Sequence, residues 1–122
     1  MMADLIFFTA VSFILLHEMD AVKHYEWNLL PILNKMDDEK GFWWFTVLHL
    51  PLYVGLLMGV KAVILNQGLL FAQLLDGFLV IHFFLHFLLR KHPKYRFHNP
   101  LSWTLIIGAA VCGLAHLLLI ML

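Results

Sequence analysis

Residues 69–89 read LLFAQLLDGFLVIHFFLHFLL, and this stretch decides the class of fold. A helix needs about 20 mostly apolar residues to cross the hydrocarbon core of a bilayer. The stretch has that length, and Asp76 is its only charged residue. Three further stretches share this character, at residues 5–22, 42–65 and 101–122. We therefore predict an all-α integral membrane four-helix bundle.

The composition of the whole chain points to the same class of protein. Of 122 residues, 62% are hydrophobic and 13% are charged, against about 45–50% and about 25% in soluble domains. Eight basic and eight acidic residues cancel, so no basic surplus suggests binding to nucleic acid. The expected partner is the lipid bilayer, and residues 1–122 are expected to form a single domain.

The first apolar stretch, residues 5–22, resembles a signal peptide in its position. It lacks a basic n-region and a clear small-residue cleavage site, and it contains His17, Glu18 and Asp20. These features predict a retained transmembrane helix.

The segments between the apolar stretches predict how the helices are joined. Residues 66–68, Asn-Gln-Gly, favour a tight turn, and Asn99 followed by Pro100 is typical of a helix start. Residues 23–41 mix aromatic, aliphatic and polar side chains and end in a charged run. That mixture predicts a short interfacial helix lying on the membrane.

Lysine and arginine are distributed unevenly between the connections. Seven of the eight fall in the first and third connections, and only Lys61 lies toward the other face. Because cytoplasmic loops are enriched in these residues, both termini are predicted to be non-cytoplasmic. The expected location is a bacterial inner (plasma) membrane.

Three histidines reach one depth in the predicted bundle. Counted at about 1.5 Å per residue, His17, His49 and His82 each lie about 10 Å inside the cytoplasmic ends of their helices. Titratable groups in hydrocarbon are costly, so they usually face the bundle interior and carry function. The shared depth predicts a site built from three helices.

Residues on neighbouring helical turns add further candidate ligands to the site predicted at this depth. Asp20 and His24 share a face with His17, and His86 follows His82 at a spacing that can clamp one metal ion. Imidazole and carboxylate ligands suit a transition metal, with iron or zinc favoured. The predicted ligands are His17, Asp20, His24, His49, His82 and His86. Glu18 and Glu26 are the predicted catalytic residues, as proton acceptors or orienting groups.

Several alternatives remain open from the sequence. Each histidine could instead form a hydrogen bond between helices, and two of them could be axial ligands of a haem. A non-enzymatic accessory subunit or a small transporter of protons or metal is a further class. Gly55 and Gly59 form a G-x-x-x-G pattern that marks tight helix contact, within one chain or in a homo-oligomer. Asp76 and His116 could pair across the bundle, structurally or as part of a proton path.

A family resemblance accompanies these patterns. Residues 16–21 (LHEMDA), 48–52 (LHLPL) and 82–86 (HFFLH) resemble small uncharacterised bacterial four-helix membrane proteins, similar to families named for an H-x-x-E-E motif. Asp20 stands at the first acidic position of that motif, and Ala21 replaces the second. The resemblance implies four helices, histidines near one membrane face and metal binding.

Together these observations favour a metal-dependent enzyme. Its chemistry would be oxidative or hydrolytic, on a lipid, a quinone or another apolar substrate at the cytoplasmic side of the membrane.

Overall fold

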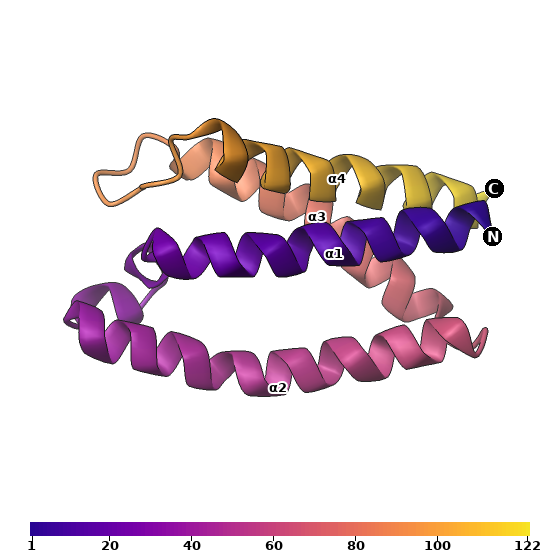
Figure 1. Cartoon of the computed structure of the whole chain (residues 1–122), viewed down its shortest axis with the longest axis horizontal. Helices are drawn as coiled ribbons and strands as arrows, with labels where there is room; N and C mark the ends of the chain where they lie inside the picture. Colours follow the sequence, from indigo (N-terminus) through magenta and orange to yellow (C-terminus); the bar gives the residue numbers. More distant parts are fainter.

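A computed structural model describes the whole chain, residues 1–122, and it is entirely helical. Four α-helices follow one another in the order α1 (Met2–Lys23), α2 (Asp38–Ile64), α3 (Leu69–Leu89) and α4 (Pro100–Met121). All four are long and apolar enough to cross a membrane, which confirms the predicted fold class. Both termini lie at the same end of the bundle (Figure 1). The opposite end carries residues 24–37 and 90–99, and we call it the loop end.

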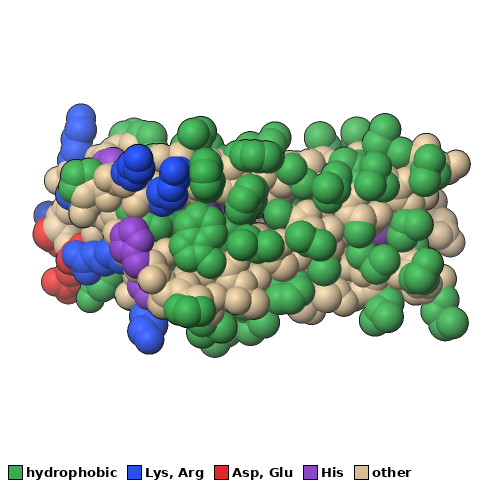
Figure 2. Space-filling model, turned by 90° about the horizontal axis from the view of Figure 1, so that it is seen from above, with side chains coloured by type: hydrophobic (Ala, Val, Ile, Leu, Met, Phe, Trp, Pro, Cys, Tyr) green, Lys and Arg blue, Asp and Glu red, His purple; other side chains and the backbone are tan.

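The polar surface is confined largely to the loop end. Figure 2 shows lysine, arginine and acidic side chains gathered there, while hydrophobic side chains cover the rest of that face. Large exposed apolar residues such as Leu50, Leu57 and Leu88 are 68–72% exposed along α2 and α3. Such a surface is costly in water and matches the hydrocarbon of a bilayer.

Helices α1, α3 and α4 form the packed part of the bundle, because α1 and α3 both pack along α4. Helix α2 stands apart from α1 in Figure 1 and touches α3 near their shared turn. Only Gly41, Phe45 and Gly59 are buried on α2. A β-carbon at Gly59 would collide with the ring of Phe71, so this glycine permits the close contact between α2 and α3.

The start of α2 explains the largest difference from the predicted bounds, which otherwise agree within three residues. The side chain of Asp37 accepts a hydrogen bond from the backbone N–H of Lys40 at 2.9 Å and caps the helix. Asp38 and Glu39 then lie in the first turn, where negative charge complements the helix dipole. The charged run expected to close the interfacial segment therefore begins α2.

The segment between α1 and α2 differs from the predicted interfacial helix. It forms two 3₁₀ turns, η1 (Glu26–Leu29) and η2 (Leu33–Lys35). Pro31 lies between them, and Ile32 adopts a φ of 71°, which ends any helical path at that point. Trp27 packs so tightly against Gly41 that a β-carbon there would strike the indole, and this contact holds the segment on the start of α2.

Candidate metal centre

Glu26 reaches the bundle interior because the chain turns back after α1. Tyr25 adopts the left-handed conformation, with φ 55° and ψ 47°, immediately beyond the helix. This reversal directs Glu26 toward His17, which lies on the buried face of α1. The Nε2 of His17 lies 3.2 Å from Oε2 of Glu26, at hydrogen-bond distance.

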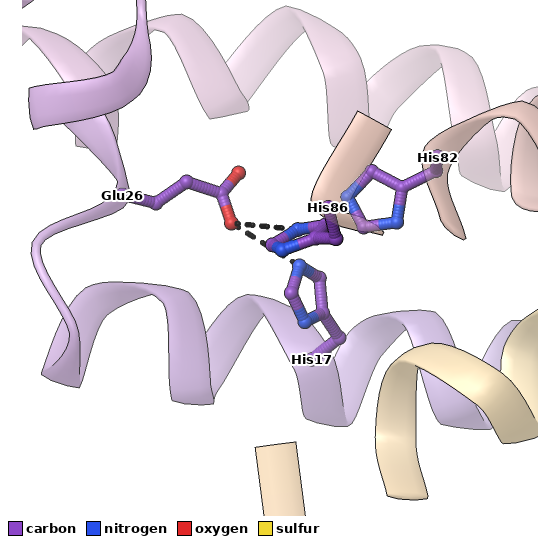
Figure 3. Close-up of side chains that lie close together, drawn as sticks. All are labelled: His17, Glu26, His82 and His86. Atoms are coloured by element: carbon purple, nitrogen blue, oxygen red, sulfur yellow. Dashed lines mark hydrogen bonds and ion pairs between the residues drawn. The ribbon is translucent and has the colours of Figure 1, made fainter. Parts of the chain in front are cut away.

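Helix α3 supplies two more imidazoles on one face. His82 and His86 are both buried, and the centroids of their rings lie 4.6 Å apart. The ring of His17 is 4.7 Å from that of His82 and 5.0 Å from that of His86. Figure 3 shows the three rings gathered beside the carboxylate of Glu26. Three side chains on two helices and one on a turn thus meet at a single point.

The spacing of these groups suits one metal ion. Each of the four residues offers a ligand atom, and these atoms lie within 4.8 Å of one another. Ligands at about 2.1 Å from a tetrahedral zinc ion lie about 3.4 Å apart. Oε2 of Glu26 is 3.2 Å from Nε2 of His17 and 3.7 Å from Nε2 of His86, which brackets that separation. The remaining ligand atoms are at most 4.8 Å apart, so their separations exceed it by no more than about 1.4 Å.

Polar groups within the protein satisfy this cluster incompletely. Nδ1 of His17 is buried and has no hydrogen-bond partner, so Glu26 is the only hydrogen-bond partner of this ring. Within the cluster, Nδ1 of His17 is the one nitrogen that is both fully enclosed and unpaired. Buried polar atoms are nearly always paired, so an unpaired one calls for a specific explanation. The four residues each offer a ligand atom, so the cluster could hold a metal ion.

Tyr95 orients the ring of His86 from the third connection. Its hydroxyl lies 3.0 Å from Nδ1 of His86. When Nδ1 carries the proton and donates it to the tyrosine oxygen, Nε2 presents its lone pair to the cluster. Burial raises the pKa of Tyr95, with a smaller contribution from the nearby carboxylates of Glu26 and Asp20, so the phenol stays neutral.

Asp20 and His24 lie in a different network, although they share the face of His17. Oδ1 of Asp20 is 3.1 Å from Nδ1 of His24, and Oδ2 accepts a hydrogen bond from the hydroxyl of Ser102 on α4. Nε2 of His24 meets the side-chain amide of Asn99. This network links the ends of α1 and α4, and neither residue is among the four grouped ligands.

His49 lies against Glu18 and does not join the cluster. Its Nδ1 donates to the carbonyl oxygen of Phe45, and its Nε2 is 2.6 Å from Oε2 of Glu18. This contact joins α1 to α2. The structure therefore brings together His17, His82 and His86 from the predicted ligand set, and adds Glu26 to them.

Comparison with known proteins gives one match. A model for a family of unknown function, DUF6713, matches residues 3–122. The chain belongs to this family. No curated protein and no solved structure matches the chain. The likeness to families named for an H-x-x-E-E motif is not part of the match.

This family member carries a second buried polar contact far from the loop end. Nδ1 of His116 on α4 lies 2.7 Å from Oδ2 of Asp76 on α3, so the two residues do pair across the bundle. Oδ1 of Asp76 is buried without a partner. Between this contact and the histidine cluster lies an apolar layer, made of Ala10, Ile14, Leu79 and Ala109. The two polar levels are thus separated by packed hydrocarbon.

Three residues that support the histidines were absent from the sequence-based site. They are Tyr95, which contacts His86, Ser102, which contacts Asp20, and Phe97. Phe97 is fully buried, with its ring 4.9 Å from that of His86. The sequence signal at this place is the cap pattern of α4, in which the side chain of Asn99 accepts a hydrogen bond from the backbone N–H of Ser102.

Proposed function

We propose that this protein is an integral membrane metal-binding protein whose ion is held by His17, Glu26, His82 and His86. The observation that carries the proposal is the convergence of three imidazoles and one carboxylate from three elements on one point. Three nitrogen ligands and one oxygen ligand suit zinc or iron(II). No thiolate contributes, because Cys112 lies on α4 outside the cluster.

The energetics of the buried cluster support this assignment. Three imidazoles packed edge to edge offer more hydrogen-bonding atoms than Glu26 and Tyr95 can satisfy. Leaving such groups unpaired in an apolar interior costs roughly 1–3 kcal/mol each. A divalent ion converts that cost into coordination bonds and neutralises the carboxylate at the same time.

A catalytic role for the metal extends the proposal. Sites closed by four protein ligands are usually structural, whereas catalytic zinc sites keep three protein ligands and an open position. The side chain of Glu26 is 15% exposed against 0% for His17, and it lies on a turn outside the helices. Movement of Glu26 would leave a three-histidine site open toward the loop end. Such a site would serve oxidative or hydrolytic chemistry on an apolar substrate.

The position of the centre relative to the membrane follows from charge. The loop end carries seven of the eight lysine and arginine residues, so we place it in the cytoplasm. The metal would then lie just inside the cytoplasmic face.

The geometry does not favour haem at the same place. A haem needs two axial histidines on opposite sides of a flat macrocycle. Here the three rings lie 4.6–5.0 Å apart, edge to edge, and leave no planar space between them.

Metal analysis of the purified protein tests the proposal. After purification without chelator, we expect about one zinc or iron ion per chain, measured by inductively coupled plasma mass spectrometry. The His82→Ala variant should lose this metal, while His92→Ala, at an exposed loop histidine, should retain it. Far-UV circular dichroism checks that both variants are helical. A folded parent protein without metal, or full metal content in His82→Ala, would overturn the assignment.

A further inference from the structure

A groove of about 530 Å³ lies on the bundle surface between α1, α2 and α3. Its walls are mostly apolar and include Leu52, Leu56 and Phe78. Volumes of about 300–1,000 Å³ with apolar walls and a few polar groups are typical of small-molecule sites. None of the four proposed metal ligands lines it, so it is a separate site.

The polar groups of the groove gather at one place. Glu18 and His49 line it together with Tyr53, whose ring lies 5.7 Å from that of His49. A second pocket of about 470 Å³ borders the same three residues from the other side. These polar side chains therefore form a wall that can be reached from both pockets, beside helices whose other surfaces face lipid.

The hydrogen bonds already made define what a ligand would find. Both nitrogens of His49 are engaged, by Phe45 and by one oxygen of Glu18. The other oxygen of Glu18 and the hydroxyl of Tyr53 take part in no hydrogen bond within the chain. One acceptor and one donor thus remain free beside an apolar channel. A hydroxyl group can donate to the first and accept from the second.

The charges around the groove exclude an anionic head group. No lysine or arginine lines either pocket. A carboxylate or phosphate would therefore meet the carboxylate of Glu18 with no free cation to pair with it, because both nitrogens of His49 are engaged, and this is costly. A neutral head group meets no such penalty.

We propose that the groove binds an apolar-chain alcohol, with its hydroxyl between Glu18 and Tyr53 and its chain along Leu52, Leu56 and Phe78. The shared chemistry is one neutral hydroxyl on a hydrocarbon chain, as in a fatty alcohol, a prenol or a diacylglycerol. If the neighbouring metal centre is catalytic, this names its substrate class, a step that rests on the proposed function. Binding itself does not depend on the metal.

Two glycines provide a matched pair of variants. A β-carbon at Gly55, which lines the groove, meets nothing within 4 Å, and the same holds for Gly77, which does not line it. Gly55→Phe should therefore add its ring at the groove, where the β-carbon meets no neighbouring atom, and Gly77→Phe makes the same change away from it. Tyr53→Phe removes only the hydroxyl and leaves the wall in place.

The test measures binding of tritiated hexadecanol to the purified protein in detergent by scintillation proximity. We expect saturable binding to the parent and to Gly77→Phe, about tenfold weaker binding to Tyr53→Phe, and none to Gly55→Phe. Unlabelled geranylgeraniol and dioleoylglycerol, used as competitors, identify which source of the hydroxyl is preferred. Hexadecanoate and hexadecyl methyl ether should compete at least about tenfold less well than hexadecanol.

Equal binding to Gly55→Phe and the parent would overturn the proposal, as would equal competition by the methyl ether. The first outcome would mean that the alcohol binds outside the groove, and the second that the groove holds hydrocarbon chains without recognising a hydroxyl group. Metal content measured on the same samples keeps the two proposals apart, because Gly55→Phe leaves the four metal ligands in place. A parent protein that holds metal but binds no alcohol refutes the groove alone, and a metal-free parent that binds alcohol refutes the metal centre alone.

Discussion

The contact between Asp76 and His116 offers a sharp test of how this bundle tolerates buried polar groups. Asp76 is fully buried, and its Oδ2 lies 2.7 Å from His116 while its Oδ1 has no partner. Replacing His116 by leucine therefore leaves both carboxyl oxygens unpaired. Placing an aspartate in hydrocarbon costs about 2.5–3.5 kcal/mol on insertion scales. We expect His116→Leu to lower the free energy of unfolding by about 3 kcal/mol.

The double variant separates this effect from a simple loss of contact. In Asp76→Leu/His116→Leu both polar groups are gone, and two apolar side chains can pack between α3 and α4. Replacing a buried polar pair by apolar residues is often close to neutral. We expect the double variant to be about 2 kcal/mol more stable than His116→Leu alone.

Unfolding by SDS in mixed micelles, followed by far-UV circular dichroism, measures these differences. Thr104→Leu, at an exposed position of α4, is the control and should change stability by less than about 0.5 kcal/mol. A His116→Leu variant as stable as the parent would refute the reasoning. So would a double variant that is less stable than either single variant, since that result would make the contact itself the main source of stability.

Two further predictions concern the loop end and the α2–α3 contact. Tyr95→Phe removes the partner of His86 Nδ1 and should weaken metal affinity about 10- to 100-fold, measured by competition with a chelator; unchanged affinity would show that the phenol does not orient the ring. Gly59→Ala should destabilise the protein because its β-carbon strikes Phe71, whereas Gly55→Ala has open space and gains helix propensity of up to about 1 kcal/mol. Thermal unfolding compares the two, and equal melting temperatures would contradict the packing described for Gly59.

The helices could be predicted from sequence because length and hydropathy suffice to define them. A run of about 20 apolar residues has few alternatives to the α-helix in a bilayer, because the backbone must satisfy its hydrogen bonds internally. The start of α2 was missed because Asp37 acts as a cap, a local effect that a hydropathy count does not see. The two 3₁₀ turns could not be predicted because the positive φ angles fall at Tyr25 and Ile32. Glycine, the residue that usually indicates a positive φ in a sequence, is absent there.

The candidate site could be predicted only in part, because depth along a helix says nothing of its rotation or its distance from neighbours. Depth counting placed His17, His49 and His82 on one level, and the structure brings two of them together. His49 has the same depth on a helix that stands apart, so it meets Glu18 instead. Asp20 shares the stripe of His17 but faces Ser102 on α4, a partner that spacing within α1 could not reveal.

The packing of α1 along α4 has a consequence for biogenesis. Residues 24–99 separate the end of α1 from the start of α4, and ribosomes add about 5–20 residues per second, so α1 precedes its main partner by roughly 4–15 s. During this interval α1 enters the membrane with His17, Glu18 and Asp20 before Ser102 exists to meet Asp20. An insertase or chaperone that shelters these polar groups would act on α1 first. The nascent chain should therefore cross-link to such a factor through α1 until α4 emerges.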